Sequence, residues 1–143
     1  QRVARAVSMS SRACAKAGVV PDEVTWLEGY RAALPYFCVA DTGYRFGIRD
    51  ANYHGQCPPH LEQRFLDGYR LGQDIHDLNA RIAEADKAID ELREAMNSDD
   101  ATEVSLEVDG RWLEHYKTER ERLRRQLFDL EMRARQRGFP AAY

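Results

Sequence analysis

The most regular hydrophobic pattern in this chain begins after Pro59 and ends near Met96. Its apolar positions alternate spacings of three and four residues: Ile75, Leu78, Ile82, Ala85, Ile89, Leu92 and Met96. Such a heptad repeat is typical of a long helix that packs along a partner helix. A second repeat, interrupted by Arg120 and ended by Gly138 and Pro140, runs through Leu113, Tyr116, Leu123, Leu127, Leu130 and Ala134. The pattern predicts two long helices, over residues 59–96 and 110–137.

The segment between the two repeats, residues 97–110, reads NSDDATEVSLEVDG and is rich in the turn formers Asn, Ser, Asp and Gly. We therefore expect a short polar link. Two consecutive helices joined in this way fold back most simply as an antiparallel hairpin. The second helix would then end near Gly68 and Gly72, and Phe139 and Tyr143 are expected to pack there.

The first part of the chain predicts shorter helices. Residues 1–17 are compatible with a helix that Gly18 ends, and Asp22 begins a second, amphipathic helix that extends to about Leu34. Pro35 is expected to disturb the end of that helix. Residues 36–58 are dense in Gly, Asp, Asn and aromatic residues. We expect mostly ordered loop there, with one short turn of helix around Tyr44.

A Gly-Tyr-Arg sequence occurs three times, beginning at Gly29, Gly43 and Gly68. In each copy a small residue follows the leading Gly by four positions: Ala33, Gly47 and Gly72. On a helix such a pair shares one face and lets another backbone approach closely. The Tyr rings are expected to fill the crevices beside these contacts. The alternative is that the Tyr and Arg side chains form a ligand-binding surface.

Together these patterns predict an all-α protein in two parts. Residues 1–73 form a small domain of helices and loops tied by cysteines, hereafter the cysteine-tied domain. Residues 74–143 form an antiparallel coiled-coil hairpin that packs back on the first part. No apolar run approaches the roughly 20 residues that a membrane-spanning helix needs.

Charge is distributed unevenly along the chain, although the net charge is only −3. Lys and Arg number 9 against 7 Asp and Glu in residues 1–73, 3 against 12 in residues 74–109, and 9 against 5 in residues 110–143. The acidic and basic arms are expected to neutralise each other along the hairpin. The alternative is that the basic run from Lys117 to Arg137 binds an anionic polymer or lipid head groups. The small net charge argues against a nucleic-acid partner.

The three cysteines are the first candidates for chemistry. Cys38 and Cys57 enclose a loop of about 20 residues, and in an oxidising compartment a disulfide between them would stabilise the fold by on the order of 3 kcal/mol. Cys14 would then stay unpaired in this segment or pair with a cysteine outside it. Two alternatives remain open. One is a zinc site made of Cys14, Cys38, Cys57 and His60, and the other is a set of free thiols.

The sequence contains no recognisable catalytic constellation. The four histidines are scattered, no Ser or Cys lies in a nucleophile elbow, and no phosphate-binding Gly loop is present. We therefore predict a protein that is not an enzyme and that uses no cofactor and no metal.

The ordered motifs of the first half resemble a known family. They are WLEGYRAALPYFC at residues 26–38, GYRFG at residues 43–47, YHGQCP at residues 53–58 and GYRLG at residues 68–72. In this succession, over residues 10–73, the chain resembles the proteobacterial family catalogued as domain of unknown function 2799. That family brings no known activity with it.

Members of that family are mostly predicted lipoproteins of the bacterial envelope. The resemblance therefore implies export to an oxidising periplasm and attachment to the outer membrane through an acylated cysteine upstream of Gln1. It also implies an upstream cysteine that is able to pair with Cys14. Membrane attachment is expected through that lipid anchor alone.

Two functions fit these expectations. The first is a structural or protein-interaction component of the cell envelope, whose hairpin docks a protein partner or forms a homo-oligomer. The alternative is a module that binds glycan or peptidoglycan through the loop of residues 38–57. Its binding surface would consist of Tyr44, Arg45, Asn52 and Tyr53.

Overall fold

The computed structural model describes residues 2–20 and 22–140, without the side chains of residues 2–7 and 10. Within these residues the fold consists of helices and contains no strand. The helices are α1 (Arg2–Lys16), α2 (Glu23–Phe37), α3 (Ala40–Ile48), α4 (Pro59–Met96) and α5 (Glu103–Gln136). The all-α class predicted from the sequence is confirmed.

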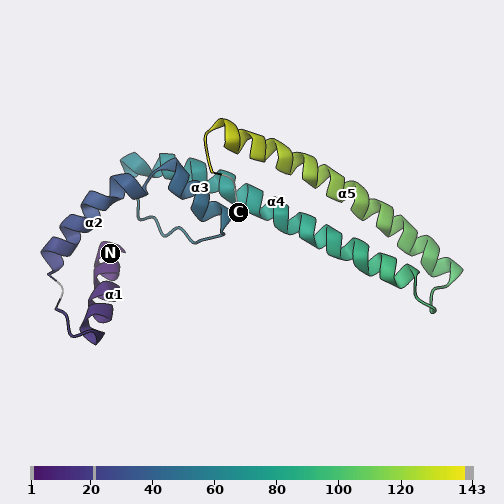
Figure 1. Ribbon diagram of the computed structural model, residues 1–143, viewed down its shortest axis with the longest axis horizontal. Coiled ribbons are helices and arrows are strands. Elements are labelled where there is room, and N and C mark those ends of the chain that lie inside the picture. Colours follow the sequence, from purple (N-terminus) through teal and green to yellow (C-terminus); the bar gives the residue numbers. More distant parts are fainter. Residues whose placement is uncertain (1, 21, 141–143) are drawn as a thin grey trace.

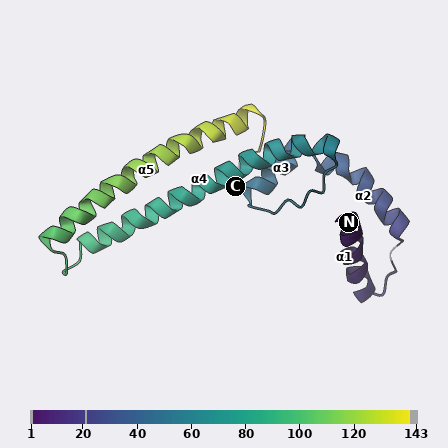
Figure 2. The same cartoon turned by 180° about the vertical axis from the view of Figure 1, so that it is seen from behind.

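The molecule is elongated, with the hairpin at one end and the short helices at the other. In both ribbon views α4 and α5 lie side by side and antiparallel, joined by a short loop at the far end (Figures 1 and 2). Helix α3 lies along the first part of α4, whereas α2 and α1 extend beyond it. The far half of the hairpin therefore projects as an arm from the cysteine-tied domain.

Helix α4 belongs to both predicted parts of the chain. It runs without interruption through 38 residues, which corresponds to about 57 Å. Its N-terminus has Pro59 at the first helical position, where the missing N–H would have had no partner within the helix. The expected boundary between residues 73 and 74 lies inside this helix.

Helix α2 begins at a capping residue and continues past its proline. The Asp22 carboxylate accepts hydrogen bonds from the Thr25 hydroxyl at 2.6 Å and from the Val24 N–H at 3.1 Å. These bonds lower the pKa of Asp22 from its ordinary value. The helix then passes Pro35 and ends at Phe37, three residues beyond the expected end. It contains no buried residue, and it packs against the core through Leu34 and Phe37 near its end.

The helix expected around Tyr44 is present but longer than the one short turn predicted, because residues 40–48 form the nine-residue helix α3. Residues 49–58 form the expected loop. The glycines of this segment serve as a contact surface and do not break the helix. A Cβ atom on Gly43 would overlap the carbonyl oxygen of Phe65, and one on Gly47 would overlap that of Tyr69. Both carbonyl oxygens belong to the backbone of α4, so α3 can approach α4 this closely only where its residues have no side chain.

The contact is reciprocal. A Cβ atom on Gly68 of α4 would overlap the carbonyl oxygen of Ala40, and one on Gly72 that of Tyr44. The close backbone approach that the small-residue spacing predicted is therefore present, and it is formed between the second and third Gly-Tyr-Arg copies. Among the described residues, no atom lies within 4 Å of a Cβ added at Gly29 of the first copy, so that copy makes no such contact with them.

Helix α5 begins at Glu103, seven residues before the expected start. The Thr102 side chain accepts a hydrogen bond from the Ser105 N–H at 3.1 Å, and the Ser105 hydroxyl oxygen accepts one from the Thr102 N–H at 2.8 Å. This reciprocal capping box satisfies N–H groups that a helix start otherwise leaves unpaired. The polar link therefore shrinks to residues 97–102.

The C-terminal segment returns to the cysteine-tied domain, as the predicted antiparallel hairpin requires. Gly138 adopts a positive φ of 76°, which turns the chain after α5 so that the Phe139 N–H reaches the Ala134 carbonyl at 3.0 Å. Phe139 is buried and stacks on Tyr44, with ring centroids 4.7 Å apart. Tyr143, expected to pack at the same place, lies outside the described residues.

Two apolar clusters hold the cysteine-tied domain and the base of the hairpin together. The first lies where α3, α4 and the end of α5 meet, and its buried members are Tyr44, Leu71, Ile75, Ala134 and Phe139. The second surrounds the paired cysteines, and its buried members are Cys38, Cys57 and Phe65.

Candidate functional site at the hairpin tip

The predicted disulfide between Cys38 and Cys57 is present and confirms that pairing. Cys38 follows the last residue of α2, Cys57 lies just before α4, and their Cα atoms are 5.7 Å apart. Both are buried against Phe65. Since both sulfur atoms are engaged with each other, the alternative zinc site that needed them as thiolate ligands is wrong.

Cys14 is half-buried and has no disulfide partner within the described residues. Its pairing with a cysteine outside the chain stays a prediction. Across residues 2–20 and 22–140, no three His, Cys, Asp or Glu side chains come together in a group that fits a metal ion.

The expectation that Tyr44 is presented on a glycan-binding loop is wrong. Its side chain is only 4% exposed, because the ring lies between α4 and the C-terminal segment and stacks on Phe139. Burial, and to a smaller extent the charge of Glu131, raises the pKa of Tyr44 above its ordinary value. The Tyr44 ring therefore belongs to the core, in agreement with the expectation that the Tyr rings fill the crevices beside the small-residue contacts.

Tyr53 is half-buried and its hydroxyl group is engaged. The hydroxyl donates a hydrogen bond to Glu62 Oε1 at 3.0 Å and accepts one from the Cys57 N–H at 3.2 Å. Its ring lies 4.7 Å from that of Phe65, centroid to centroid. Of the four predicted binding residues, only Arg45 and Asn52 are exposed. The loop thus lacks the pair of accessible rings on which the glycan hypothesis rested.

The predicted charge neutralisation between the hairpin arms is present at mid-length. Arg120 Nη1 lies 2.9 Å from Asp86 Oδ1, and Arg81 Nη2 lies 3.3 Å from Glu119 Oε1. Arg120, which interrupts the heptad repeat, is therefore placed by an ion pair across the seam. Arg124 approaches the same carboxylate oxygen of Asp86 at 3.9 Å.

Toward the tip, the packing between α4 and α5 becomes less complete. Within the described residues, α4 has no buried side chain after Ile89 and α5 has none before Leu123. Three apolar side chains of α5 that are spaced four apart are largely exposed there. They are Val104 at 72%, Val108 at 48% and Trp112 at 51%. The tip therefore carries an apolar surface that the hairpin itself does not cover.

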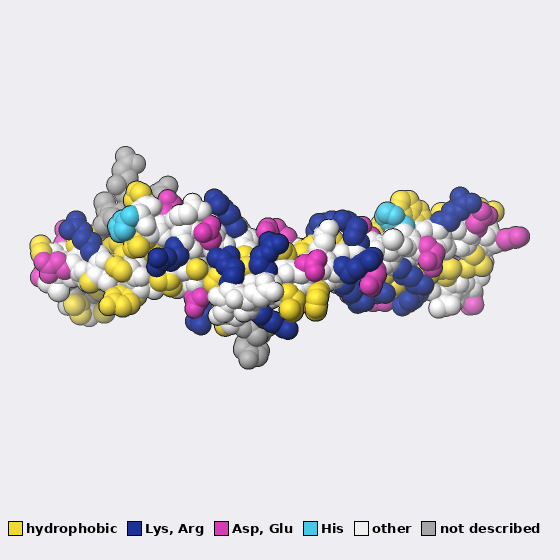
Figure 3. Space-filling model, turned by 90° about the horizontal axis from the view of Figure 1, so that it is seen from above, with side chains coloured by type: hydrophobic (Ala, Val, Ile, Leu, Met, Phe, Trp, Pro, Cys, Tyr) yellow, Lys and Arg dark blue, Asp and Glu magenta, His cyan; other side chains and the backbone are white. Residues whose placement is uncertain are grey.

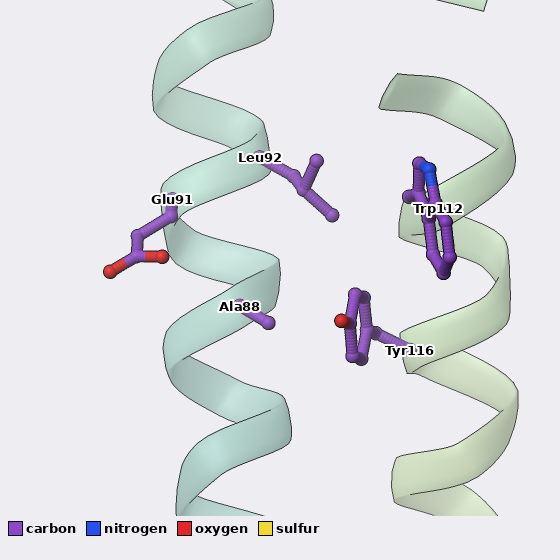
Figure 4. A pocket seen from close by; sticks show the side chains of 5 residues that line it. All are labelled: Ala88, Glu91, Leu92, Trp112 and Tyr116. Carbon is purple, nitrogen blue, oxygen red and sulfur yellow. The ribbon is translucent and has the colours of Figure 1, made fainter. Parts of the chain in front are cut away.

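A groove of about 320 Å³ lies beside this surface, between the two helices. Figure 4 shows its lining: the Trp112 and Tyr116 rings extend from α5, Leu92 and Ala88 face them from α4, and Glu91 points away from α5. The ring of Trp112 lies 6.1 Å from that of Tyr116, centroid to centroid. Because both helices keep these residues in a fixed geometry, the groove offers a preformed aromatic wall.

The surroundings of the groove are strongly acidic. Residues 90–109 contain eight Asp and Glu and a single basic residue, Arg93. Glu91 lies on the rim itself. An apolar groove inside a negative field favours a partner that combines apolar side chains with Lys or Arg.

This site was not predicted from the sequence, because residues 97–110 were expected to form a polar link between the two long helices. The signal was available: Val104, Val108 and Trp112 follow one another at the four-residue spacing of one helix side. Read as helix, the segment carries an apolar stripe beside the heptad seam. The enzyme prediction is not tested by this geometry.

These features define a small, disulfide-tied all-α protein whose projecting helical hairpin carries an exposed aromatic groove at its tip. The model of a family described as a protein of unknown function, DUF2799, matches residues 2–74, and the chain belongs to that family. The match covers the cysteine-tied domain and ends inside α4. The hairpin tip therefore lies beyond the matched residues.

No curated protein and no solved structure matches the chain. Among the described residues, every helix is too short or too polar to cross a membrane.

Proposed function

We propose that this protein is a non-enzymatic interaction component of the bacterial cell envelope, in which the hairpin is a docking arm for a protein partner. The observation that carries the proposal is the uncovered apolar surface at the hairpin tip, formed by Val104, Val108 and Trp112 beside the groove. Apolar patches that are rimmed by polar residues mark interaction sites in soluble proteins.

The construction of the arm supports docking. The cysteine-tied domain fixes the start of α4 through the glycine contact with α3 and through the disulfide, and α4 then continues to the tip. The groove is thereby held far from the disulfide on a continuous helix. A preformed site on rigid elements binds with little loss of conformational entropy.

The chemistry of the groove suggests the kind of partner. An amphipathic helix could place its apolar side chains against Trp112 and Leu92 while its Lys or Arg residues face Glu91 and the other acidic residues of the tip. A second copy of this chain is a poorer fit at the same place, because its tip is equally acidic and would be repelled.

The proposed location rests on the disulfide and on the family. A buried disulfide is typical of proteins in oxidising compartments, and the periplasm is such a compartment. An acylated cysteine upstream of Gln1 would attach the cysteine-tied domain to the outer membrane and leave the arm free to reach a partner.

Photocrosslinking in the cell tests the docking proposal. A photoreactive residue at position 104 should give a crosslinked protein product, and Trp112→Ala in the same chain should abolish it. Position 106 provides the matched control. Leu106 lies on the same turn of α5 as Val104, but a separation of two residues places its side chain on nearly the opposite side of the helix. The crosslinked peptide should carry apolar residues at helical spacing together with Lys or Arg. No product, or equal products from positions 104 and 106, would refute the proposal.

A further inference from the structure

A second unpartnered surface lies on the outer side of α5, away from the tip. Phe128 is 60% exposed and Met132, one turn later, is 36% exposed. Both lie outside the stripe through which this half of α5 packs, which consists of Leu123, Leu127, Leu130 and Ala134. Burial in the hairpin therefore does not explain why two large apolar side chains occupy these positions.

Three arginines surround this pair at helical spacing. Arg124 and Arg125 precede Phe128 by four and three positions, and Arg135 follows Met132 by three, so all five side chains share one side of α5. We call this set the basic outer face. Figure 3 looks onto α5 and shows Lys and Arg side chains gathered over the middle of the molecule, with hydrophobic side chains among them.

Most of this positive charge is not neutralised by the hairpin. Arg125 and Arg135 are exposed, and neither side chain makes an ion pair or a hydrogen bond to another described residue. Arg124 has only the 3.9 Å approach to Asp86, which it shares with Arg120. Three carboxylates border the face: Glu121, Asp129, and Glu131, which is half-buried and acts on Tyr44. Lys and Arg nevertheless outnumber Asp and Glu over this stretch of α5 as a whole.

We propose that the basic outer face binds the surface of an anionic phospholipid bilayer, with Phe128 and Met132 inserted at the level of the head groups. A helix that presents apolar side chains among arginines is suited to lie in the plane of a membrane surface. The aliphatic stems of the arginines accompany the apolar side chains while their guanidinium groups reach the phosphates.

The charge distribution along the hairpin orients the arm on such a surface. Residues 120–137 of α5 contain seven Lys and Arg and three Asp and Glu, whereas residues 90–109, from the end of α4 to the start of α5, contain one and eight. An anionic bilayer attracts the first segment and repels the second within about a Debye length. The base of the hairpin is therefore held closest to the membrane, and the repelled tip is tilted away from it. This inference does not depend on what the groove binds.

The test uses the full chain with its disulfide formed, mixed with vesicles of phosphatidylcholine alone or of phosphatidylcholine with phosphatidylglycerol. Sedimentation should show binding to the anionic vesicles only. The Arg125→Gln, Arg135→Gln variant should weaken it about 25-fold, from about fivefold for each arginine near the surface. Phe128→Ala should weaken binding about tenfold, and Phe128→Trp should retain it, because Trp also suits the interface.

The matched control is Arg93→Gln, Arg111→Gln, which removes the same net charge from the tip end of the hairpin. It should bind the anionic vesicles as well as the unmodified chain does. Equal weakening by both double variants would show that net charge alone drives binding and would overturn the proposal. So would equal binding to neutral vesicles, no vesicle binding, or competition by inorganic phosphate, which would indicate a site for free phosphate.

Discussion

Adding one methyl group where α3 crosses α4 tests the close contact between these two helices. In Gly68→Ala the new Cβ atom overlaps the carbonyl oxygen of Ala40 and lies 2.9 Å from the backbone nitrogen of Tyr44. Ordinary contact begins near 3.4 Å, and both neighbours are backbone atoms that cannot rotate away. The two helices must therefore separate by more than the van der Waals tolerance of a packed core.

The magnitude follows from two opposing contributions. Replacing a helical glycine by alanine favours the helix by roughly 1 kcal/mol. Overpacking a tight site costs about 1–3 kcal/mol, and the upper end applies where the neighbour is backbone. We expect Gly68→Ala to lower the free energy of unfolding by about 2 kcal/mol. Gly110→Ala in α5 has only the Met96 methyl group 4.0 Å from its Cβ, so it should raise stability by up to about 1 kcal/mol.

Urea unfolding followed by helical circular dichroism compares these two variants under identical conditions. The midpoint of Gly68→Ala should lie below that of the unmodified chain and that of Gly110→Ala above it, with unchanged slopes. Gly29→Ala offers a control inside the same motif, because nothing lies near its Cβ, and it should protect the amides of α2 from exchange. If Gly68→Ala proved as stable as Gly110→Ala, the close crossing of α3 and α4 would be refuted.

Three further predictions address the cysteines and two titrating groups. Replacing Cys38 and Cys57 together by Ala should cost about 3 kcal/mol, since a loop of this length is no longer closed in the unfolded chain, and urea unfolding with and without reductant measures it. The pKa of Tyr44 is raised in the folded state, so its stabilising effect is present below the unfolded pKa and is lost as pH rises through the folded pKa. Tyr44→Phe should therefore reduce the fall in folding stability above about pH 10, which alkaline titration of unfolding measures. The pKa of Asp22 is lowered in the folded state, so its stabilising effect on α2 is present above the unfolded pKa and is lost as pH falls through the folded pKa. Asp22→Asn keeps a capping side chain without the titrating group, so it should make the amide protection of α2 independent of pH in the acid range.

The two long helices were predictable because their core positions repeat over many turns. The predicted limits of α4, Pro59 and Met96, agree with the structure, since a proline start and a heptad seam are strong local signals. The start of α5 was not predicted. Its first turn depends on the reciprocal bonds between Thr102 and Ser105, and Ser at that position satisfies a box more often formed by Glu or Gln.

The length of helix α3 was underestimated for a different reason. Gly43 and Gly47 are weak helix formers, so local propensity favoured a loop. The tertiary contact with Gly68 and Gly72 outweighs that propensity, because only a residue without a side chain lets the two backbones meet. The small-residue spacing contained this information, but which copies would pair is decided by the chain path between them. Gly29 has the same motif, but no described residue lies against it.

The candidate site was predicted only in part. The disulfide followed from cysteine positions, whereas Tyr44 was misplaced because its partner, Phe139, lies far away in the sequence. Val104 and Val108 were overlooked because a helix was not expected there. Surface properties depend on the assembled helices, so an exposed side chain is harder to foresee than a heptad position.

The glycine crossing, the disulfide and the tip are all connected to one uninterrupted helix. A load applied at the tip by a bound partner would travel along the axis of α4 and would reach the bonded sulfur atoms without crossing a flexible joint. Tension between an anchored base and an engaged tip would therefore act along α4, parallel to its contact with α5, so that the contacts along the hairpin would share the load while the bridged end stays fixed.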